Sequence, residues 1–180
     1  GDRRHTATHR THGKTLVTDG SALNRQLYLD LLQRSLTGTL FEEEPALDYA
    51  NSLAYAANFY SHYVKGRAIS MLPLVRFDSL RACMQEVIEK GVPGDFIETG
   101  VWRGGATIFM RAMLKTHGID DRTVWVADSF EGLPHPDPQR FPKEAAARRG
   151  KVMTQLFDNL EAGLDEVRAN FAAYGLLDGQ

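Results

Sequence analysis

The sequence has little of what marks several specialised protein classes. It contains one cysteine, Cys83, in 180 residues, so it forms no internal disulfide and offers no multi-thiolate metal site. No apolar run approaches the roughly 18 to 20 residues that cross a bilayer, and the first residues do not form a signal-peptide pattern. We therefore expect a soluble, cytoplasmic protein.

An excess of charge of one sign is also absent. The 21 basic and 23 acidic residues give a formal net charge of −2, which provides no overall field to attract nucleic acid or anionic lipid. Residues 1–20 are locally basic and almost free of large apolar side chains, which predicts a flexible tail. A basic arm that binds nucleic acid is the alternative, disfavoured because no aromatic residues lie among the charges.

What is present is the composition of an ordinary globular domain, with 43% apolar and 24% charged residues. Apolar side chains at helical spacing predict one helix from an N-cap at Ser21 to a stop at Gly38. The same spacing predicts a second helix, from a cap at Asp78 to an end at Gly91. We interpret residues 21–91 as a helical N-terminal or lid region that precedes the main fold.

The residues between and within these helices have plainer interpretations. The acidic run 42–44 predicts a solvated helix start, where carboxylates suit the helix dipole. A paired-carboxylate acid–base site there is the less favoured alternative. Residues 59–77 mix aromatic residues, glycine and proline, which indicates an irregular connection. Cys83 lies near the apolar stripe of the second helix and is expected to be a small core residue.

The most informative pattern begins after residue 91. An apolar run from Phe96 ends at Thr99, glycines follow at positions 100, 104 and 105, and an apolar helix is expected over 106–117. A second strand is expected over 123–127. The order strand, glycine loop, helix, strand is typical of the opening of a doubly wound α/β sheet. We interpret 92–180 as the first part of a Rossmann-like domain.

The glycine loop and the end of the second strand favour binding of a nucleoside. Glycines between a parallel strand and its helix let the backbone turn tightly and approach a ligand closely. An acidic residue that ends the next strand accepts hydrogen bonds from ribose hydroxyls. Gly100, Gly104 and Asp128 occupy these places, which predicts a ligand with an adenosine-like ribose. In the alternative, the glycines serve only close packing of helix and strand.

The detail of the loop bears on which nucleoside is bound. A dinucleotide site requires G-x-G-x-x-G, whereas this loop has Trp102 in place of the second glycine, which disfavours NAD. Glu98 at the strand end would repel a pyrophosphate and could receive the ammonium of a methionyl group. The residues therefore favour S-adenosylmethionine, with a NAD-type nucleotide-binding domain as the alternative. Trp102 either packs over the donor or caps the sheet.

Three segments, DFIETGVWRGGATIFMR, DRTVWVADSFEGLP and VRANFAAYGLLD, resemble the macrocin O-methyltransferase (TylF) family, which modifies sugars on macrolides and related natural products. The resemblance runs from about Ser70 to Asp178. It implies an α/β, Rossmann-like class I methyltransferase fold, S-adenosylmethionine as methyl donor and dependence on magnesium. It also implies a small-molecule acceptor with a hydroxyl group, a role in antibiotic biosynthesis, and no nucleic-acid or membrane partner.

The residues that match the family's donor site transfer position by position. Ser70 and Met71 match a segment ahead of the fold that covers donor and substrate, and the stretch after Pro134 matches the region that shapes the acceptor pocket. The resemblance implies ten donor-binding residues: Ser70, Met71, Glu98, Thr99, Gly100, Trp102, Gly104, Gly105, Asp128 and Ser129.

The resemblance stops short of a complete catalytic site. The family's magnesium ligands and catalytic carboxylate lie in D-G-D and I-D-D-Y motifs on later strands, and neither motif occurs here. No catalytic residue and no metal ligand is therefore transferred. We expect the fold to be truncated after the second strand and the following helix, which Gly175 closes, and the 180 residues alone to be nearly inactive. A non-catalytic remnant or interaction module is the alternative, and exposed sheet edges predict association into homo-oligomers.

Other polar side chains offer no convincing chemistry. His62, His117 and His135 are isolated in the sequence and are interpreted as surface or packing residues. The basic cluster at 140–151 could attract an anionic acceptor, although a solvated loop is the favoured interpretation. Glu131 and Asp137 lack the spacing expected of a catalytic base or a metal ligand.

Overall fold

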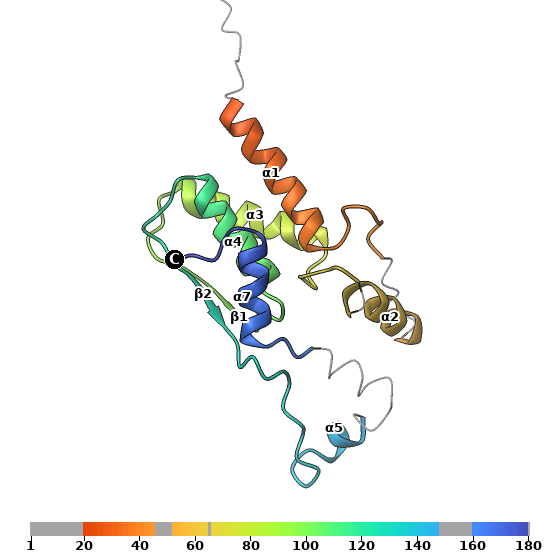
Figure 1. Ribbon diagram of the computed structural model, residues 1–180. Coiled ribbons are helices and arrows are strands. Elements are labelled where there is room, and N and C mark those ends of the chain that lie inside the picture. The colour runs from red at the N-terminus through yellow and green to blue at the C-terminus, as the bar shows by residue number, and fades with distance from the viewer. Residues whose placement is uncertain (1–19, 46–51, 65, 148–159, 180) are drawn as a thin grey trace, which may run out of the picture.

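The computed structural model describes residues 20–45, 52–64, 66–147 and 160–179. The predicted tail up to residue 19, and residues 148–151 of the basic cluster, lie outside the described residues. Within the described ranges, no helix is long and apolar enough to cross a membrane. Most of the buried apolar side chains form one cluster, and the first turns of α1 (Gly20–Leu36) extend away from the other elements (Figure 1).

A small parallel sheet joins the two strands that the sequence predicts. β1 (Phe96–Thr99) and β2 (Val124–Ala127) are connected by α4 (Gly105–Thr116), and Phe96 lies opposite Val124 in the register. Parallel neighbours need such a crossover, because a tight turn can join only antiparallel strands. The predicted order strand, glycine loop, helix, strand is therefore confirmed.

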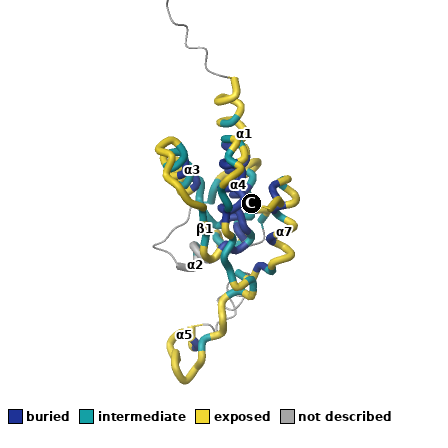
Figure 2. The backbone as a smooth tube through the Cα atoms, turned by 90° about the vertical axis from the view of Figure 1, so that its left-hand side faces the viewer, coloured by how far each residue is buried: buried dark blue, intermediate teal, exposed yellow. Residues whose placement is uncertain are grey.

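The core forms around α4, whose residues from Gly105 to Leu114 are all buried. Helix α4 is apolar on most sides, so other helices pack against it from several directions. They are α1, α3 (Leu74–Glu89) and α7 (Leu164–Ala173). Phe77 of α3 meets Phe109 of α4 edge to face, with ring centres 5.3 Å apart. Figure 2 shows the dark blue of buried residues concentrated at α4.

The two faces of the sheet differ. Val124 is buried and packs in the core with α4, whereas Ile97 and Trp125 on the other face are 62% and 56% exposed. Trp125 is held by a hydrogen bond of 2.9 Å from its indole Nε1 to Asp95 Oδ2. Parallel sheets are normally covered on both faces. In the described part of the chain, the face with Ile97 and Trp125 has no such cover.

Three elements lie at the periphery. α2 (Ser52–Phe59) continues into a π-helix, η1 (Tyr60–Val64), and α5 (Pro142–Ala147) lies at the far end of the long excursion after β2 (Figures 1 and 2). Helical structure therefore reaches Val64, and the prediction of an irregular connection over 59–77 holds only for the residues between η1 and α3. Within this helical stretch, the Tyr63 ring contacts those of Phe59 and His62.

The predicted helix starts were wrong in their capping residues. α1 begins at Gly20, so Ser21 lies inside it. α3 begins at Leu74, one turn before Asp78, with Pro73 as its N-cap residue, and Glu44 Oε1 accepts a hydrogen bond of 2.8 Å from the Leu74 N–H. The acidic run 42–44 is not helical, and its last residue instead caps a helix 30 positions later.

Cys83 is exposed, which contradicts its prediction as a core residue. The buried side of α3 carries Phe77 and Met84. Successive helical residues are about 100° apart, so the residue beside Met84 points away from the core.

Candidate functional site

The carboxyl ends of β1 and β2 meet at a cavity of about 340 Å³. Parallel strands end at the same edge of a sheet, which brings the loops after β1 and β2 together. A third segment, residues 66–72, called here the cover segment, contributes Met71. The lining residues are Met71, Gly100, Trp102, Asp128, Ser129, Gly132, Leu133, Pro134 and Leu160. Five of the ten residues predicted from the sequence thus line one cavity.

Asp128 joins the two loops. Its Oδ2 accepts a hydrogen bond of 2.7 Å from the Val101 N–H, and its Oδ1 accepts one of 2.9 Å from the Phe130 N–H. Burial raises the pKa of the Asp128 carboxyl, but hydrogen bonds from backbone N–H groups of both loops outweigh burial and hold that pKa below its usual range. Asp128 is therefore an anion that fixes the glycine loop, and a ribose hydroxyl would share its oxygens with these N–H groups.

Glu98 lies at the end of β1, behind the glycine loop. Burial raises the pKa of its carboxyl to about 7, although a hydrogen bond from the Thr107 N–H opposes the change, and the nearby Asp128 raises the pKa further. Among the described residues, no donor meets its buried Oε2. Glu98 therefore carries an unused acceptor beside the N-terminus of α4, where a cationic group would stabilise its charged form.

Gly104 and Gly105 allow close packing rather than ligand approach. A Cβ on Gly105 would lie 2.5 Å from the Ser70 Cβ, and a Cβ on Gly104 would lie 3.1 Å from Cγ1 of Val167. Ser70 is buried, and its Oγ accepts a hydrogen bond of 3.1 Å from the Leu72 N–H. Ser70, Gly104 and Gly105 thus support the cavity from behind. The interpretation that the glycines serve close packing therefore fits Gly104 and Gly105.

Gly100 and Trp102 form the wall after β1. Gly100 has φ of +81°, and a Cβ added there would meet nothing within 4 Å, so its backbone is open to a ligand. Trp102 has φ of +49° and is only 7% exposed. A non-glycine residue in this left-handed region is uncommon and clusters at binding sites. Thr99 is exposed at the strand end and does not line the cavity.

The family model for Macrocin-O-methyltransferase (TylF) matches residues 65–180. The chain belongs to this family. The match contains the cover segment, the glycine loop and Asp128, so every part of the cavity described above lies within the macrocin O-methyltransferase region. The family resemblance predicted from the sequence is confirmed.

Relatives in the family methylate hydroxyl groups of natural products, as their names state. An 8-demethyl-8-(2,3-dimethoxy-α-L-rhamnosyl)-tetracenomycin-C 4′-O-methyltransferase of Streptomyces olivaceus is 42% identical over 161 residues, which cover 87% of this chain. A demethyldecarbamoylnovobiocin O-methyltransferase of Streptomyces niveus is 42% identical over 86% of the chain. A mycinamicin III 3″-O-methyltransferase of Micromonospora griseorubida is 38% identical over 86%.

A solved structure shows the same arrangement. The O-methyltransferase NovP superposes with a TM-score of 0.62 at 39% identity and over 87% of this chain. The present chain spans 62% of that structure, and 59 to 61% of the three relatives. The small parallel sheet with its helices is therefore part of a methyltransferase fold.

The described residues contain no group of three His, Cys, Asp or Glu side chains that could hold a metal ion. His62 Nε2 pairs with the Thr37 carbonyl at 2.9 Å, and His117 Nδ1 with the Met113 carbonyl at 2.8 Å. Both contacts lie outside the cavity, which fits the interpretation of His62 and His117 as packing residues. The family's implied magnesium does not fit the residues that this part of the chain provides.

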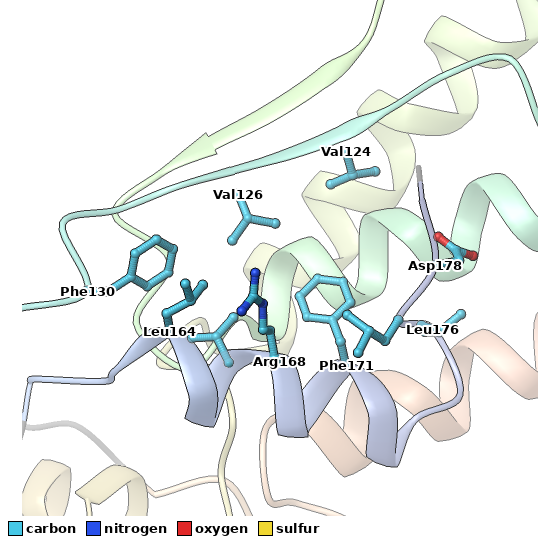
Figure 3. A pocket seen from close by; sticks show the side chains of 10 residues that line it. Val124, Val126, Phe130, Leu164, Arg168, Phe171, Leu176 and Asp178 are labelled. Carbon is cyan, nitrogen blue, oxygen red and sulfur yellow. The ribbon is translucent and has the colours of Figure 1, made fainter.

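A second cavity, of about 260 Å³, lies between β2 and α7. In Figure 3, Val124, Val126 and Phe130 face Leu164 and Phe171 across it, and Arg168 points into it from α7. None of the ten predicted residues lines it. Eight of its ten lining residues are apolar, and Arg168 and Asp178 are its two charged ones.

Sequence reasoning missed four lining residues and one supporting residue. Gly132, Leu133, Pro134 and Leu160 line the cavity, and Arg103 contacts its wall from behind. Gly132 has φ of +70°, and a Cβ there would lie 3.0 Å from the Glu161 Cβ. Gly132 lies in the run Glu-Gly-Leu-Pro, shortly after the predicted ribose-binding residues, and this position could have indicated that it belongs to the cavity.

Proposed function

We propose that this chain carries the donor-binding part of an S-adenosylmethionine-dependent O-methyltransferase of Rossmann-like class I fold. Its acceptor would be a hydroxyl on a sugar or another group of a natural product, in cytoplasmic antibiotic biosynthesis. The observation that supports this most is the meeting of Met71, Gly100 and Asp128, from three separate segments, around one cavity. The named substrates of the relatives support a small-molecule acceptor.

The residues of the cavity suit the parts of such a donor. S-adenosylmethionine, when bound, supplies a methyl group attached to a positively charged sulfur. Asp128 would accept hydrogen bonds from the ribose hydroxyls, and Glu98, which lies behind the glycine loop and does not line the cavity, would offset the charge of the ammonium group when ionised. Gly100 lets the backbone approach the ligand, while Met71 and Trp102 provide apolar walls that exclude water. Magnesium receives no role here, because the described residues offer it no ligand set.

A nicotinamide dinucleotide is the competing ligand. Trp102 is buried against the cavity where a dinucleotide loop would need glycine. Glu98 at the strand end also carries charge of the wrong sign for a pyrophosphate once it ionises. Both residues favour a donor without phosphates over NAD.

Calorimetric titration with S-adenosylhomocysteine tests the proposal. Asp128→Asn keeps the side-chain shape and removes its charge, and should weaken binding about tenfold, as expected for loss of charge-assisted hydrogen bonds. Asp95→Asn is the matched control, because Asp95 also accepts from a backbone N–H and a side chain, but at the other end of the sheet. Absence of heat with the unmodified chain would overturn the proposal, and quenching of tryptophan fluorescence by NAD would favour the alternative.

A further inference from the structure

Arg103 follows Trp102 in the glycine loop, and its side chain contacts other parts of the chain. Its Nη1 donates hydrogen bonds to the carbonyl oxygens of Ala68, at 3.1 Å, and Tyr63, at 3.4 Å. Its Nε lies 3.1 Å from Oε1 of Glu166 in α7. Its guanidinium carbon lies 4.4 Å from the ring centre of Trp102. One side chain therefore joins the glycine loop to η1, the cover segment and α7.

The cover segment is also held by α1. The N–H groups of Ile69 and Ser70 both donate to the Leu36 carbonyl, at 2.8 and 3.0 Å. At Gly66 the backbone turns so closely on η1 that a Cβ would lie 1.9 Å from the His62 carbonyl oxygen. The segment is thus a strap between α1 and the glycine loop, and Arg103 makes the polar connection on the side of the loop.

Trp102 depends on its neighbours for its conformation. The left-handed backbone of a non-glycine residue is disfavoured, so surrounding contacts must hold it. Trp102 belongs to a small buried cluster with Tyr63 and Ala68, against which Met71 packs, and the Arg103 guanidinium lies over its ring. The carbonyl of Arg103 accepts a hydrogen bond of 3.0 Å from Asn170 Nδ2, which fixes the backbone beside Trp102.

We propose that Arg103 is a positioning residue for the donor site. By bonding to the cover segment and stacking on Trp102, it holds Met71 and Trp102 together as one wall of the cavity, without touching the donor. This inference rests on the proposed function. Arginine suits the role better than lysine, because its planar group can stack on a ring, donate to two carbonyls and meet a carboxylate at once.

The test compares Arg103→Ala and Arg103→Lys with Arg81→Ala, all in a Trp125→Phe background that leaves Trp102 as the only tryptophan. Arg81 is a matched control, because it also pairs with a carboxylate, that of Asp30, and its side chain is 25% exposed against 23% for Arg103. The readouts are Trp102 emission, its quenching by acrylamide, the melting curve, and calorimetric affinity for S-adenosylhomocysteine.

We expect Arg103→Ala to shift Trp102 emission to longer wavelength, to increase quenching and to weaken binding about tenfold, the size expected for losing ordered hydrogen bonds and a ring contact. Arg103→Lys should melt like the parent and recover neither the emission nor the affinity. Arg81→Ala should change neither property. The inference is overturned if Arg103→Ala leaves Trp102 emission and quenching unchanged, or if Arg81→Ala produces the same changes.

The two proposals fail in different ways. If the parent protein binds S-adenosylhomocysteine and Arg103→Ala binds it equally well, the role of Arg103 is refuted and the proposed function stands. If the parent protein does not bind the ligand, the proposed function is refuted, and the emission of Trp102 still decides whether Arg103 holds the wall.

Discussion

Replacing Glu98 with glutamine should stabilise the protein at neutral pH and above, and change its stability little in acid. Glutamine keeps the shape of the side chain and an oxygen that can accept the hydrogen bond from the Thr107 N–H. Burial raises the pKa of the Glu98 carboxyl to about 7, from an ordinary value of 4.5. The ionised form of Glu98 is therefore the one that the folded protein disfavours.

The sign and size follow from proton linkage. The folded state binds the Glu98 proton more tightly than the unfolded chain, so the stabilisation is complete below pH 4.5 and is lost as the pH rises through about 7. The difference between these two pKa values corresponds to about 3 kcal/mol of unfolding free energy. Partial solvent exposure of the side chain reduces the expected effect to about 2 kcal/mol. Glu98→Gln, which does not ionise, should gain this amount relative to the parent protein across the interval.

Urea unfolding of both proteins, at pH values between about 4 and about 8, measures the difference in unfolding free energy. Comparing the two proteins removes the contribution of other groups that titrate in the same range. Glu89→Gln, at an exposed position of α3, controls for replacing a carboxyl by an amide. A difference between Glu98→Gln and the parent that stays constant across the pH range would refute the reasoning, as would a loss of stability at high pH.

Further predictions concern packing and activity. The Arg111 side chain is only 3% exposed and pairs with the Asp178 carboxylate. Asp178→Ala removes that carboxylate and should lower the free energy of unfolding, measured in urea, by about 3 kcal/mol. Adding Arg111→Met to the same chain should restore part of that loss. Gly105→Ala places a methyl group against Ser70 and should lower the free energy of unfolding by about 1 to 3 kcal/mol in the same assay. In Gly163→Ala the added methyl group meets nothing within 4 Å, so the free energy of unfolding should change little. The 180-residue chain should bind S-adenosylhomocysteine but should form none of it from S-adenosylmethionine and a sugar-bearing acceptor, because the family's D-G-D and I-D-D-Y motifs do not occur in the sequence. Detectable turnover would contradict this.

Much of the fold could be predicted because its signals are local. The strand ending at Thr99, the following glycines and the apolar helix α4 are neighbours in sequence, and each restricts the backbone of the next. Gly175, with φ of +66°, ends α7 as its position predicts. Asp128 could be placed at the site because it directly follows β2.

The errors arose where a distant residue decides local structure. The first N–H of α3, that of Leu74, donates to Glu44, 30 positions earlier, so Glu44's part in starting the helix could not be read from the residues near Asp78, although Pro73 marks the start locally. The interpretation of Cys83 required the direction in which α3 packs, which is set by Phe77 and Met84 together with α4. The contacts of Arg103 with Ala68 and Glu166 span 35 and 63 positions, and a sequence motif carries no trace of them.

The exposure of Cys83 has a practical consequence for handling the protein. Because the chain has no second cysteine, oxidation can join two molecules through α3 and then has no thiol left with which to continue. Covalent products in air should therefore stop at a dimer that a reducing agent reverses. The same thiol accepts a maleimide dye or a spin label without any substitution, which gives a single reporter on α3.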